Sequence, residues 1–408
     1  MKQGWEEIKM VEACDILTCG VASTPNYVDE EIGIPFLSAQ NVRDGDIVLD
    51  KYNFITKEFH QKLTTKNKPS KGDILYSRVG AKYGEAGVVE HNFEFSVYVS
   101  VTLIRPKKEL LNNYFLKNYL NSPRIKDLAR KSITSSGVPN LNVNSVREFP
   151  VPIPPLPEQQ RIVSILDEAF VAIAKAKANA EQNLRNAKEL FESYLQGVFE
   201  IKGDGWEEKM LGEVLLKTET VDPTKKPNEE FIYLDVSSVN KETKEIENAT
   251  ILLGKDAPSR ARKLVRTNDV IFATVRPTHS RVALIPQQYN EQVCSTGYFV
   301  LRAKEYLNNN LIYYFLLTNG FNKQMEKLQK GASYPAVTDS EVKGIYISFP
   351  KSLSEQITII RQLDALKVET KKLEAIYQQK INDLDEMKKS ILQKAFSGEL
   401  VTNKTIIL

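Results

Sequence analysis

Two pairs of short polar loops carry the residues that could do chemistry in this 408-residue sequence. The first pair follows an apolar run in each half, as SRVGAKYGE at 77–85 and ATVRPTHSR at 273–281. Arginine can bind guanine through two hydrogen bonds in the major groove of DNA, and small neighbours let the backbone approach a base. The candidate DNA-contacting residues of this pair are Arg78, Lys82, Tyr83, Arg276, His279 and Arg281.

The second pair of loops is KSITSSGVPNLNV at 131–143 and KGASYPAVT at 330–338. Serine, asparagine and glycine in these loops could contact phosphates or adenine edges. Ordinary turn formation explains the same residue types equally well. The candidate DNA-contacting residues of this pair are Lys131, Ser135, Asn140, Lys330, Ser333 and Tyr334.

The charge distribution favours the same interpretation. The net charge is only +3, yet eight lysines and arginines lie between Lys51 and Lys82 and seven between Lys255 and Arg281, each stretch against two acidic residues. Basic stretches at matching places suit two phosphate-binding surfaces. The alternative for either stretch alone is a solvated lysine-rich loop.

Motifs for catalysis and for metal binding are absent from the sequence. There is no G-x-x-x-x-G-K-[ST] phosphate loop, no G-x-G-x-x-G after a strand, and no N-P-P-[FY] or D-P-P-Y methyltransferase loop. The three histidines are scattered, and three cysteines indicate buried free thiols in a reducing cytosol. We therefore expect no catalytic residue, no metal and no cofactor in this chain, and a cytoplasmic location.

An internal repeat organises the chain at an offset of 196 to 201 residues. GWEE at 4–7 recurs at 205–208, GDILYSRV at 72–79 matches NDVIFATV at 268–275, and LQGVF at 195–199 matches LQKAF at 392–396. The pair EQ at 158–159 recurs at 355–356. The matches keep their order, which indicates one module used twice rather than a chance likeness.

Each half begins with short strands and helices and ends with one long helix. The runs 74–79, 96–104 and 270–275 predict buried strands, and 112–122 and 309–319 predict short helices. Prolines from Pro150 to Pro157 predict an extended lead-in to the first long helix. Ser354 is a candidate N-cap for the second.

The long helices are predicted over Glu158–Phe199 and Ser354–Ser397, each with one apolar stripe. About 42 residues of helix extend ~60 Å, further than a ~150-residue domain can cover. The two stripes are most simply covered by each other in an antiparallel coiled coil. The weaker alternative packs each helix on its own domain.

These patterns predict an α+β fold with two tandem mixed α/β domains separated by two long helices that form an antiparallel coiled coil. The expected boundaries are 1–150 for the first domain, 151–200 for the first helix, 201–350 for the second domain and 351–408 for the second helix.

With these features the chain resembles the specificity subunit of type I restriction–modification systems. The marks are GWEE at the start of each half, SRVG after GDIL, VPIPPLPEQ at 151–159 and AFSGEL at 395–400. The duplicated layout covers essentially the whole chain. Two departures stand out: FPKSLSEQ at 349–356 lacks the proline run, and the second half reads ATVR in place of SRVG.

The resemblance implies that each domain is a target-recognition domain reading one half of an asymmetric, gapped sequence in double-stranded DNA. The helices would fix the gap and dock two methyltransferase subunits, and through them the restriction subunits. S-adenosylmethionine, ATP and magnesium would belong to those partners, with no membrane involved. The implied subunit-binding residues are Glu158, Gln159, Leu166, Leu195, Phe199, Glu355, Gln356, Leu363, Leu392 and Phe396.

Two other interpretations stay open at this point. One is the specificity subunit of a Type IIB-like system, which neighbouring genes would distinguish. The other is a two-domain enzyme with its site between the repeats, which an assay of the purified chain for methyl transfer or nuclease activity would distinguish. The bases of the target cannot be read from the sequence.

Overall fold

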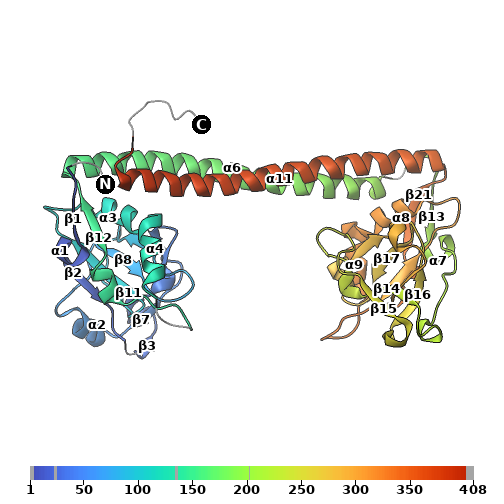
Figure 1. Cartoon of the computed structure of the whole chain (residues 1–408), viewed down its shortest axis with the longest axis horizontal. Helices are drawn as coiled ribbons and strands as arrows, with labels where there is room; N and C mark the ends of the chain where they lie inside the picture. The colour runs from blue at the N-terminus through green and yellow to red at the C-terminus, as the bar shows by residue number, and fades with distance from the viewer. Residues whose placement is uncertain (1–3, 23–24, 134–136, 202, 401–408) are drawn as a thin grey trace. The chain divides into compact units, whose positions relative to one another are not determined.

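The computed structural model describes residues 4–22, 25–133, 137–201 and 203–400, which fall into two compact units. Unit 1 comprises residues 1–180 and 379–408, and unit 2 comprises residues 181–378. Each unit holds one mixed α/β domain and part of two 45-residue helices, α6 (Leu156–Glu200) and α11 (Leu353–Ser397) (Figure 1). The predicted α+β class with two tandem domains and two long helices is therefore confirmed.

The domain of unit 1 is built on a central antiparallel sheet of strand order β2-β11-β8-β9. A second sheet has the order β10-β4-β7-β3, with β10 parallel to β4, and β5 and β6 form a small ribbon. The strands of these sheets are β2 (Cys14–Cys19), β3 (Tyr27–Val28), β4 (Ile34–Leu37), β5 (Val42–Arg43), β6 (Asp46–Ile47), β7 (Asn53–Ile55), β8 (Ile74–Ser77), β9 (Ala86–Val88), β10 (Ser96–Val97) and β11 (Val101–Pro106). The short helices are α1 (Met10–Ala13), α2 (Lys57–Thr64), α3 (Asn113–Leu120), α4 (Pro123–Lys131) and α5 (Val143–Arg147).

The domain of unit 2 follows a related plan. Its central sheet has the order β18-β17-β20, and a second sheet has the order β15-β14-β19-β16. These strands are β14 (Glu230–Leu234), β15 (Thr250–Leu253), β16 (Ala261–Val265), β17 (Val270–Ala273), β18 (Val282–Leu284), β19 (Gln292–Ser295) and β20 (Tyr298–Leu301). The short α-helices are α7 (Leu211–Val214), α8 (Asn309–Leu316), α9 (Asn319–Leu328) and α10 (Asp339–Lys343).

Most predicted elements are present, with one strand divided. The runs at 74–79 and 270–275 form β8 and β17, and the predicted short helices form α3 and α8. The run at 96–104 is two strands, β10 and β11, because a turn closed by Val101 N–H donating to the Tyr98 carbonyl (3.0 Å) separates them. The turn lets the chain pass from the second sheet to the central one.

The repeated GWEE motif leads into the strand that pairs with the last strand of each domain. In unit 1, β1 (Glu6–Lys9) pairs antiparallel with β12 (Pro150–Ile153). In unit 2, β13 (Trp206–Met210) pairs in the same way with β21 (Tyr346–Pro350). The first strand of each domain therefore holds the last strand in place just before the long helix begins.

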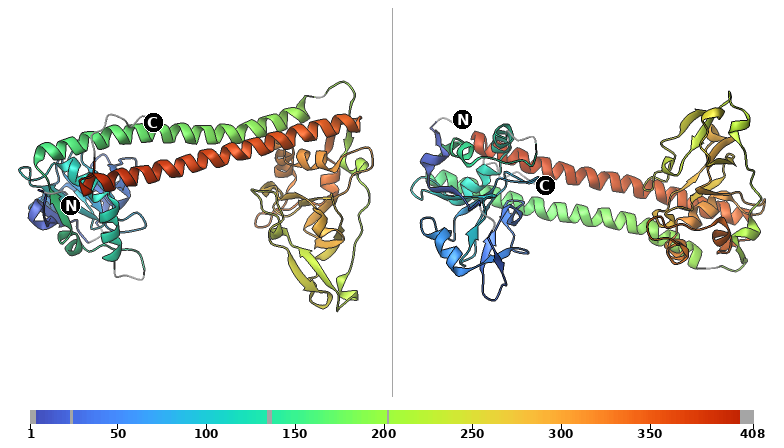
Figure 2. Two further views of the ribbon diagram at one scale, coloured as in Figure 1. Left: turned by 45° about the horizontal axis from the view of Figure 1, so that its top comes forward. Right: turned by 90° about the horizontal axis from the view of Figure 1, so that it is seen from below.

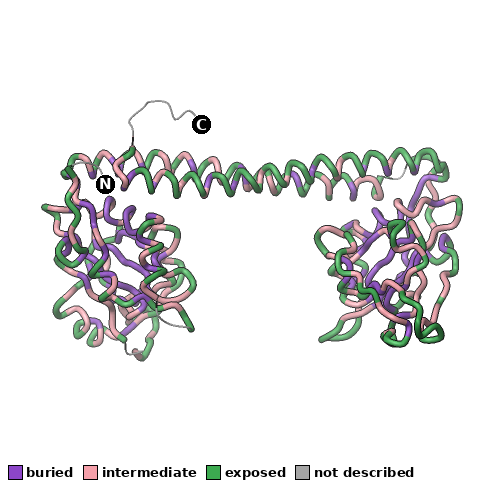
Figure 3. Tube along the Cα trace, viewed as in Figure 1, coloured by how far each residue is buried: buried purple, intermediate pink, exposed green. Residues whose placement is uncertain are grey.

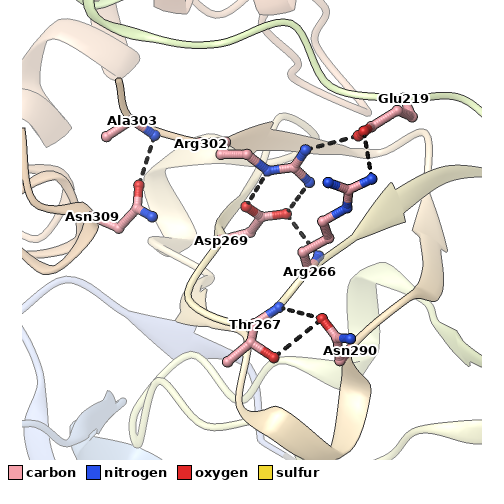
Figure 4. Close-up of polar contacts among 8 residues, drawn as sticks. All are labelled: Glu219, Arg266, Thr267, Asp269, Asn290, Arg302, Ala303 and Asn309. Carbon is pink, nitrogen blue, oxygen red and sulfur yellow. Dashed lines mark hydrogen bonds and ion pairs between the residues drawn. The ribbon is translucent and has the colours of Figure 1, made fainter. Parts of the chain in front are cut away.

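The aspartate that precedes each central strand is buried and paired with arginine. Asp269, 1% exposed, accepts two hydrogen bonds from Arg302 (2.8 and 2.7 Å) and one from the backbone N–H of Arg266 (2.8 Å) (Figure 4). Asp73 makes the same bidentate contact with Arg105 (2.7 and 2.8 Å). A planar guanidinium that meets a carboxylate in this way is among the stronger polar contacts in proteins. The repeated aspartate is thus a structural feature of the frame.

In both units α6 lies beside α11 (Figure 2). In unit 1 the ammonium of Lys388 lies 5.1 Å from the ring centre of Phe170, and Lys177 pairs with Asp385 at 2.6 Å, so later residues of α6 meet earlier residues of α11 and the helices are antiparallel. The apolar stripes are covered from two sides, since Leu166 shares one core cluster with residues of the domain and with Leu392. The buried residues gather in the sheets and on these inner helix faces (Figure 3).

The start of α11 corrects one prediction. Ser354, the expected N-cap, lies inside the helix, which begins at Leu353. Ser352 directly precedes the helix, and its hydroxyl accepts a hydrogen bond from the backbone N–H of Glu355 at 3.4 Å. The helix begins one residue before the predicted start at Ser354, because Ser352 is as suitable a cap as Ser354. Across the described residues, no helix is both long and apolar enough to span a bilayer.

Candidate nucleic-acid interface

The two predicted loops of unit 2 meet at the end of strand β17. Val275 forms a β-bridge with Ala336, and the backbone N–H of Arg276 donates to the carbonyl of Pro335 at 2.7 Å. Lys330 and Ala336 exchange two backbone hydrogen bonds of 2.9 Å, which closes the second loop into a hairpin. The loops therefore form one joined surface fixed to the frame of the domain.

Arg276 and Tyr334 face each other across this surface. The central carbon of the Arg276 guanidinium lies 5.4 Å from the ring centre of Tyr334, whose side chain is 73% exposed. Arg276 is exposed and its backbone is left-handed, with φ of +49°. A cation over an aromatic face is attracted by the negative face of the ring. The contact joins one candidate residue from each loop.

The other candidates of unit 2 are placed differently. His279 and Ser333 are exposed. Arg281 is half-buried and donates to the carbonyl of Val239. Lys330 is exposed, and its ammonium pairs with Glu341 at 2.8 Å, a contact that together with hydrogen bonds from Thr338 lowers the pKa of Glu341 to about 2.

The loops of unit 1 join in the same way at the end of β8. Val79 bridges Asn140, and the backbone N–H of Gly80 donates to the carbonyl of Pro139 at 3.1 Å. Arg78, 8% exposed, lies beneath this junction. Its guanidinium donates to the carbonyls of Leu141 (2.8 Å) and Val99 (3.0 Å) and to the side chain of Asn140 (3.1 Å). In this structure Arg78 holds the two loops together instead of facing outward.

The remaining candidates of unit 1 lie around that junction. Lys82 and Lys131 are exposed, whereas Tyr83 is half-buried and packs against the core. Asn140 is exposed apart from its contact with Arg78. Ser135 lies outside the described residues.

The matching hydrogen bonds establish which residues correspond in the two repeats. Gly80 and Arg276 each donate from the backbone to a loop proline, so Arg276 occupies the place of Gly80. Arg78 corresponds to Thr274, whose hydroxyl donates to the carbonyl of Gly297 at 3.0 Å. The two arginines singled out in the sequence are therefore not equivalent. Where the first repeat has the buried side chain of Arg78, the second has the buried side chain of Thr274.

Part of the positive charge in the two basic stretches is offset within the chain. Lys68 pairs with Glu94, and Lys263, whose side chain is 18% exposed, pairs with Asp339 at 2.7 Å. Arg266 pairs with Glu219 at 2.8 Å (Figure 4). The stretches are thus interwoven with acidic side chains, and the joined loops are the more specific candidates for a contact with nucleic acid.

Groups suited to redox or metal chemistry are few in the part of the chain that the structure describes. No group of three or more His, Cys, Asp or Glu side chains there could hold a metal ion. Cys14 and Cys294 are buried, and burial raises the pKa of each thiol to about 12. Cys19, expected to be buried, is half-buried.

The comparisons with known proteins agree with this arrangement. The family of type I restriction modification DNA specificity domains matches the chain twice, over residues 2–182 and 203–383. The chain belongs to this specificity family. Each match contains one complete pair of joined loops.

Similar proteins span nearly the whole chain. A protein of Methanocaldococcus jannaschii described as the MjaX specificity subunit of a type I restriction enzyme is 23% identical over 98% of this chain and 94% of its own length. The EcoKI specificity subunit of Escherichia coli K12 is 22% identical over 92% of this chain and 84% of its own length. A solved chain from a type I R-M system has a TM-score of 0.76 at 18% identity, over 98% of this chain and 99% of that one. The HsdS subunit of Thermoanaerobacter tengcongensis has a TM-score of 0.61 at 18% identity, over 98% of both chains.

In this specificity-family chain, most of the helix residues expected to bind partner subunits lie inside the molecule. The buried leucines and Phe396 are at most 5% exposed, and Phe199 is half-buried against the core of unit 2. Glu158 pairs with Arg161, and Glu355 accepts from the indole of Trp206 at 3.1 Å. These buried side chains pack within the chain, and their expected role in partner binding stays a prediction. The buried leucines are Leu166, Leu195, Leu363 and Leu392.

The glutamine of each repeated EQ pair joins the start of a long helix to its own domain through hydrogen bonds. Gln159, with no exposed surface, accepts from the backbone N–H of Asn112 and donates to the carbonyls of Leu110 and Pro154, each at 2.8 Å. Gln356, also fully buried, makes the same three contacts in unit 2, with distances of 2.8, 2.9 and 2.8 Å. The signal for this role was present in the sequence, because Gln159 continues the apolar stripe of Ile162 and Leu166.

Proposed function

We propose that this chain is the sequence-specific DNA-recognition and scaffold subunit of a type I restriction–modification complex. Each domain would read one half of an asymmetric, gapped target in double-stranded DNA. The observation that carries the proposal is the double match to the specificity family, with one pair of joined loops inside each match. The loops combine exposed cations, amides and an aromatic ring, which are the groups that bind phosphates and base edges.

The chemistry of the complex is assigned to partners. Two methyltransferase subunits would dock on the helices and methylate adenine with S-adenosylmethionine, and restriction subunits would join through them with ATP and magnesium. The chain itself would contribute recognition and no catalytic group, in keeping with a sequence that carries no catalytic motif of the classes considered above. Copurification with the products of adjacent genes, followed by mapping of methylated adenines in the host genome, tests this assignment.

Three results are expected from that experiment. The complex methylates one bipartite motif, the purified chain alone binds DNA, and the chain alone transfers no methyl group. Robust methylation by the chain alone would contradict the assignment, as would a complex whose methylation does not depend on this chain.

The long helices are proposed to set the number of unspecified bases between the two half-sites. An insertion of four residues near Asn179–Asn183 of α6 adds about one turn, ~6 Å, which is close to two base pairs of B-DNA at ~3.4 Å each. It also keeps the apolar stripe nearly in phase, whereas two residues would rotate it by ~200°. The expected result is an unchanged pair of half-sites with a longer gap. An active variant with an unchanged gap would refute the spacing role.

A further inference from the structure

Arg276 adopts a backbone conformation that its side chain disfavours. Its φ is +49°, and Gly80, at the equivalent place in the first repeat, has a φ of +94°. Glycine adopts this region without a steric penalty, whereas a residue with a Cβ atom is strained there. Strain of this kind persists where the surrounding structure enforces it, and it clusters at functional sites. An arginine where glycine would be easier therefore calls for a functional reason.

The surrounding loop fixes the backbone of Arg276. The residue is followed by the short 3-10 helix Pro277–His279, in which Pro277 is buried. A second left-handed residue, Ser280, ends this turn, and its hydroxyl lies 3.3 Å from the side-chain oxygen of Asn322 on α9. Together with the 2.7 Å hydrogen bond to Pro335, these contacts leave little freedom at the Cα atom of Arg276. A contact made by this side chain would therefore be preorganised.

The guanidinium itself is positioned by Tyr334 without using its N–H groups. It lies over the ring at 5.4 Å, and in the described part of the chain no hydrogen bond or ion pair joins it to another residue. A guanidinium held over a ring by its charge keeps its N–H donors for an outside acceptor. The two acceptors that match such an edge on a base are O6 and N7 of guanine in the major groove.

A contact with a phosphate fits these observations less well. A phosphate requires positive charge, which a flexible lysine supplies without strain or stacking. The candidate lysine of the joined loops, Lys330, is already paired with Glu341, which reduces the attraction of this surface for phosphates. A guanidinium held in one place, with its pair of N–H donors unused, is instead what discrimination between bases requires.

We propose that Arg276, held against Tyr334, reads a guanine in the major groove of the half-site that the second domain binds. The inference rests on the proposed function. The first domain has no arginine at the corresponding place, because Gly80 occupies it and Arg78 is buried beneath the loops. The two domains thus read DNA with different groups at equivalent positions of the fold.

The test uses the complex copurified with its methyltransferase partners. The methylated motif is first determined in cells, and binding is then measured on the cognate duplex, on an unrelated duplex and on duplexes with 7-deazaguanine at each guanine in turn. The modified base lacks the N7 acceptor. The wild-type complex should lose affinity at one guanine of one half-site. Arg276→Ala should bind the cognate duplex about 5- to 150-fold more weakly, and the penalty at that guanine should disappear.

Three further variants separate the possible roles. Arg276→Lys keeps the positive charge but removes the planar pair of N–H donors, so it should also lose discrimination at this guanine. Tyr334→Leu removes the stacking partner and should weaken cognate binding about 2- to 5-fold. Lys225→Ala is the matched control, because it deletes an exposed positive charge at the end of the short helix Pro223–Lys225. It should leave discrimination at this guanine unchanged.

Several outcomes would overturn the inference. Equal weakening of cognate and unrelated duplexes by Arg276→Ala, with a shallower salt dependence, would show a phosphate contact. A second half-site in which no guanine is sensitive to 7-deazaguanine would also refute it, and this measurement does not depend on the folding of any variant. If the wild-type complex bound the cognate and unrelated duplexes equally, the proposed function itself would fail, whatever Arg276 does.

Discussion

Replacing Gln159 by leucine should loosen the first domain from its long helix. The leucine has nearly the same size, so the change removes polar contacts and creates little empty space. Gln159 has no exposed surface, and its amide makes three hydrogen bonds of 2.8 Å to the backbone of Asn112, Leu110 and Pro154. Gln159→Leu leaves one backbone N–H and two carbonyls without these partners.

The magnitude follows from those three groups. Leaving a buried donor or acceptor without a partner costs roughly 1–3 kcal/mol. Because a carbonyl can relax or admit a water molecule, the lower part of the range applies to the two acceptors. The free energy of unfolding of unit 1 should therefore fall by roughly 3–5 kcal/mol. Gln356→Leu should have the same effect on unit 2, because Gln356 makes the same three contacts there.

Hydrogen exchange measured peptide by peptide is the appropriate assay, since the two units need not unfold together. Gln159→Leu should accelerate exchange in the peptide that contains Asn112 and leave the peptide around Asn308 unchanged. Gln356→Leu should do the reverse. Urea unfolding of each variant gives the corresponding loss of stability.

The matched control is Gln160→Leu. Gln160 is exposed and accepts from the side chain of Asn112 at 3.0 Å, so its loss should change stability by less than ~0.5 kcal/mol. If Gln159→Leu behaved like Gln160→Leu in both assays, the buried glutamine would not be what holds the first domain to its long helix.

Three other results are expected. Burial lowers the pKa of Lys244 to about 8, so between pH 8 and the ordinary lysine pKa of 10.5 the unfolded chain holds more protons than the folded one. The contribution of Lys244 to the free energy of unfolding therefore rises with pH across that window. In urea titrations Lys244→Met should flatten this rise, whereas Lys241→Met, at an exposed lysine, should not. Cys19 should react with a water-soluble maleimide before the two buried thiols, and equal labelling of all three in the folded chain would contradict their burial. Asp269→Asn should destabilise unit 2 by roughly 3–5 kcal/mol, because it breaks a buried bidentate ion pair, and an unchanged urea midpoint would show that the pair is dispensable.

The layout of the fold could be predicted from the sequence because it depends on periodicity. The apolar stripe of each long helix and the short continuous apolar runs within 74–79 and 270–275 report local geometry directly. The division of the strand at 96–104 could not be predicted, since it results from which sheet each end joins. A pattern of apolar residues marks burial but not the strand that a residue pairs with.

The candidate site was located by its loops, but the roles of individual residues were not predictable. Both Arg78 and Arg276 were candidates in the sequence, yet Arg78 is buried with three acceptors and Arg276 lies at the surface over the ring of Tyr334. Their environments depend on contacts with residues about 60 positions away, such as Leu141 and Tyr334. The helix residues expected to bind partners are mostly buried within the chain, and their role in partner binding stays a prediction. An apolar stripe shows that one face of a helix is covered, but it does not show which surface covers it.

The composition of unit 1 has a consequence for how the protein is made. Phe396 packs edge-to-face on Phe115 and Tyr119, with ring centres 5.2 and 5.1 Å apart, so the core of the first domain includes a residue from the end of the second long helix. Unit 2, residues 181–378, is by contrast one continuous segment of the chain. At roughly 5–20 residues per second of synthesis, the first domain waits roughly 12–50 s for that phenylalanine. The usual order of folding on the ribosome is reversed here, because unit 2 can complete its core before Phe396 is made, and the core of the first domain is complete only after that residue has been added.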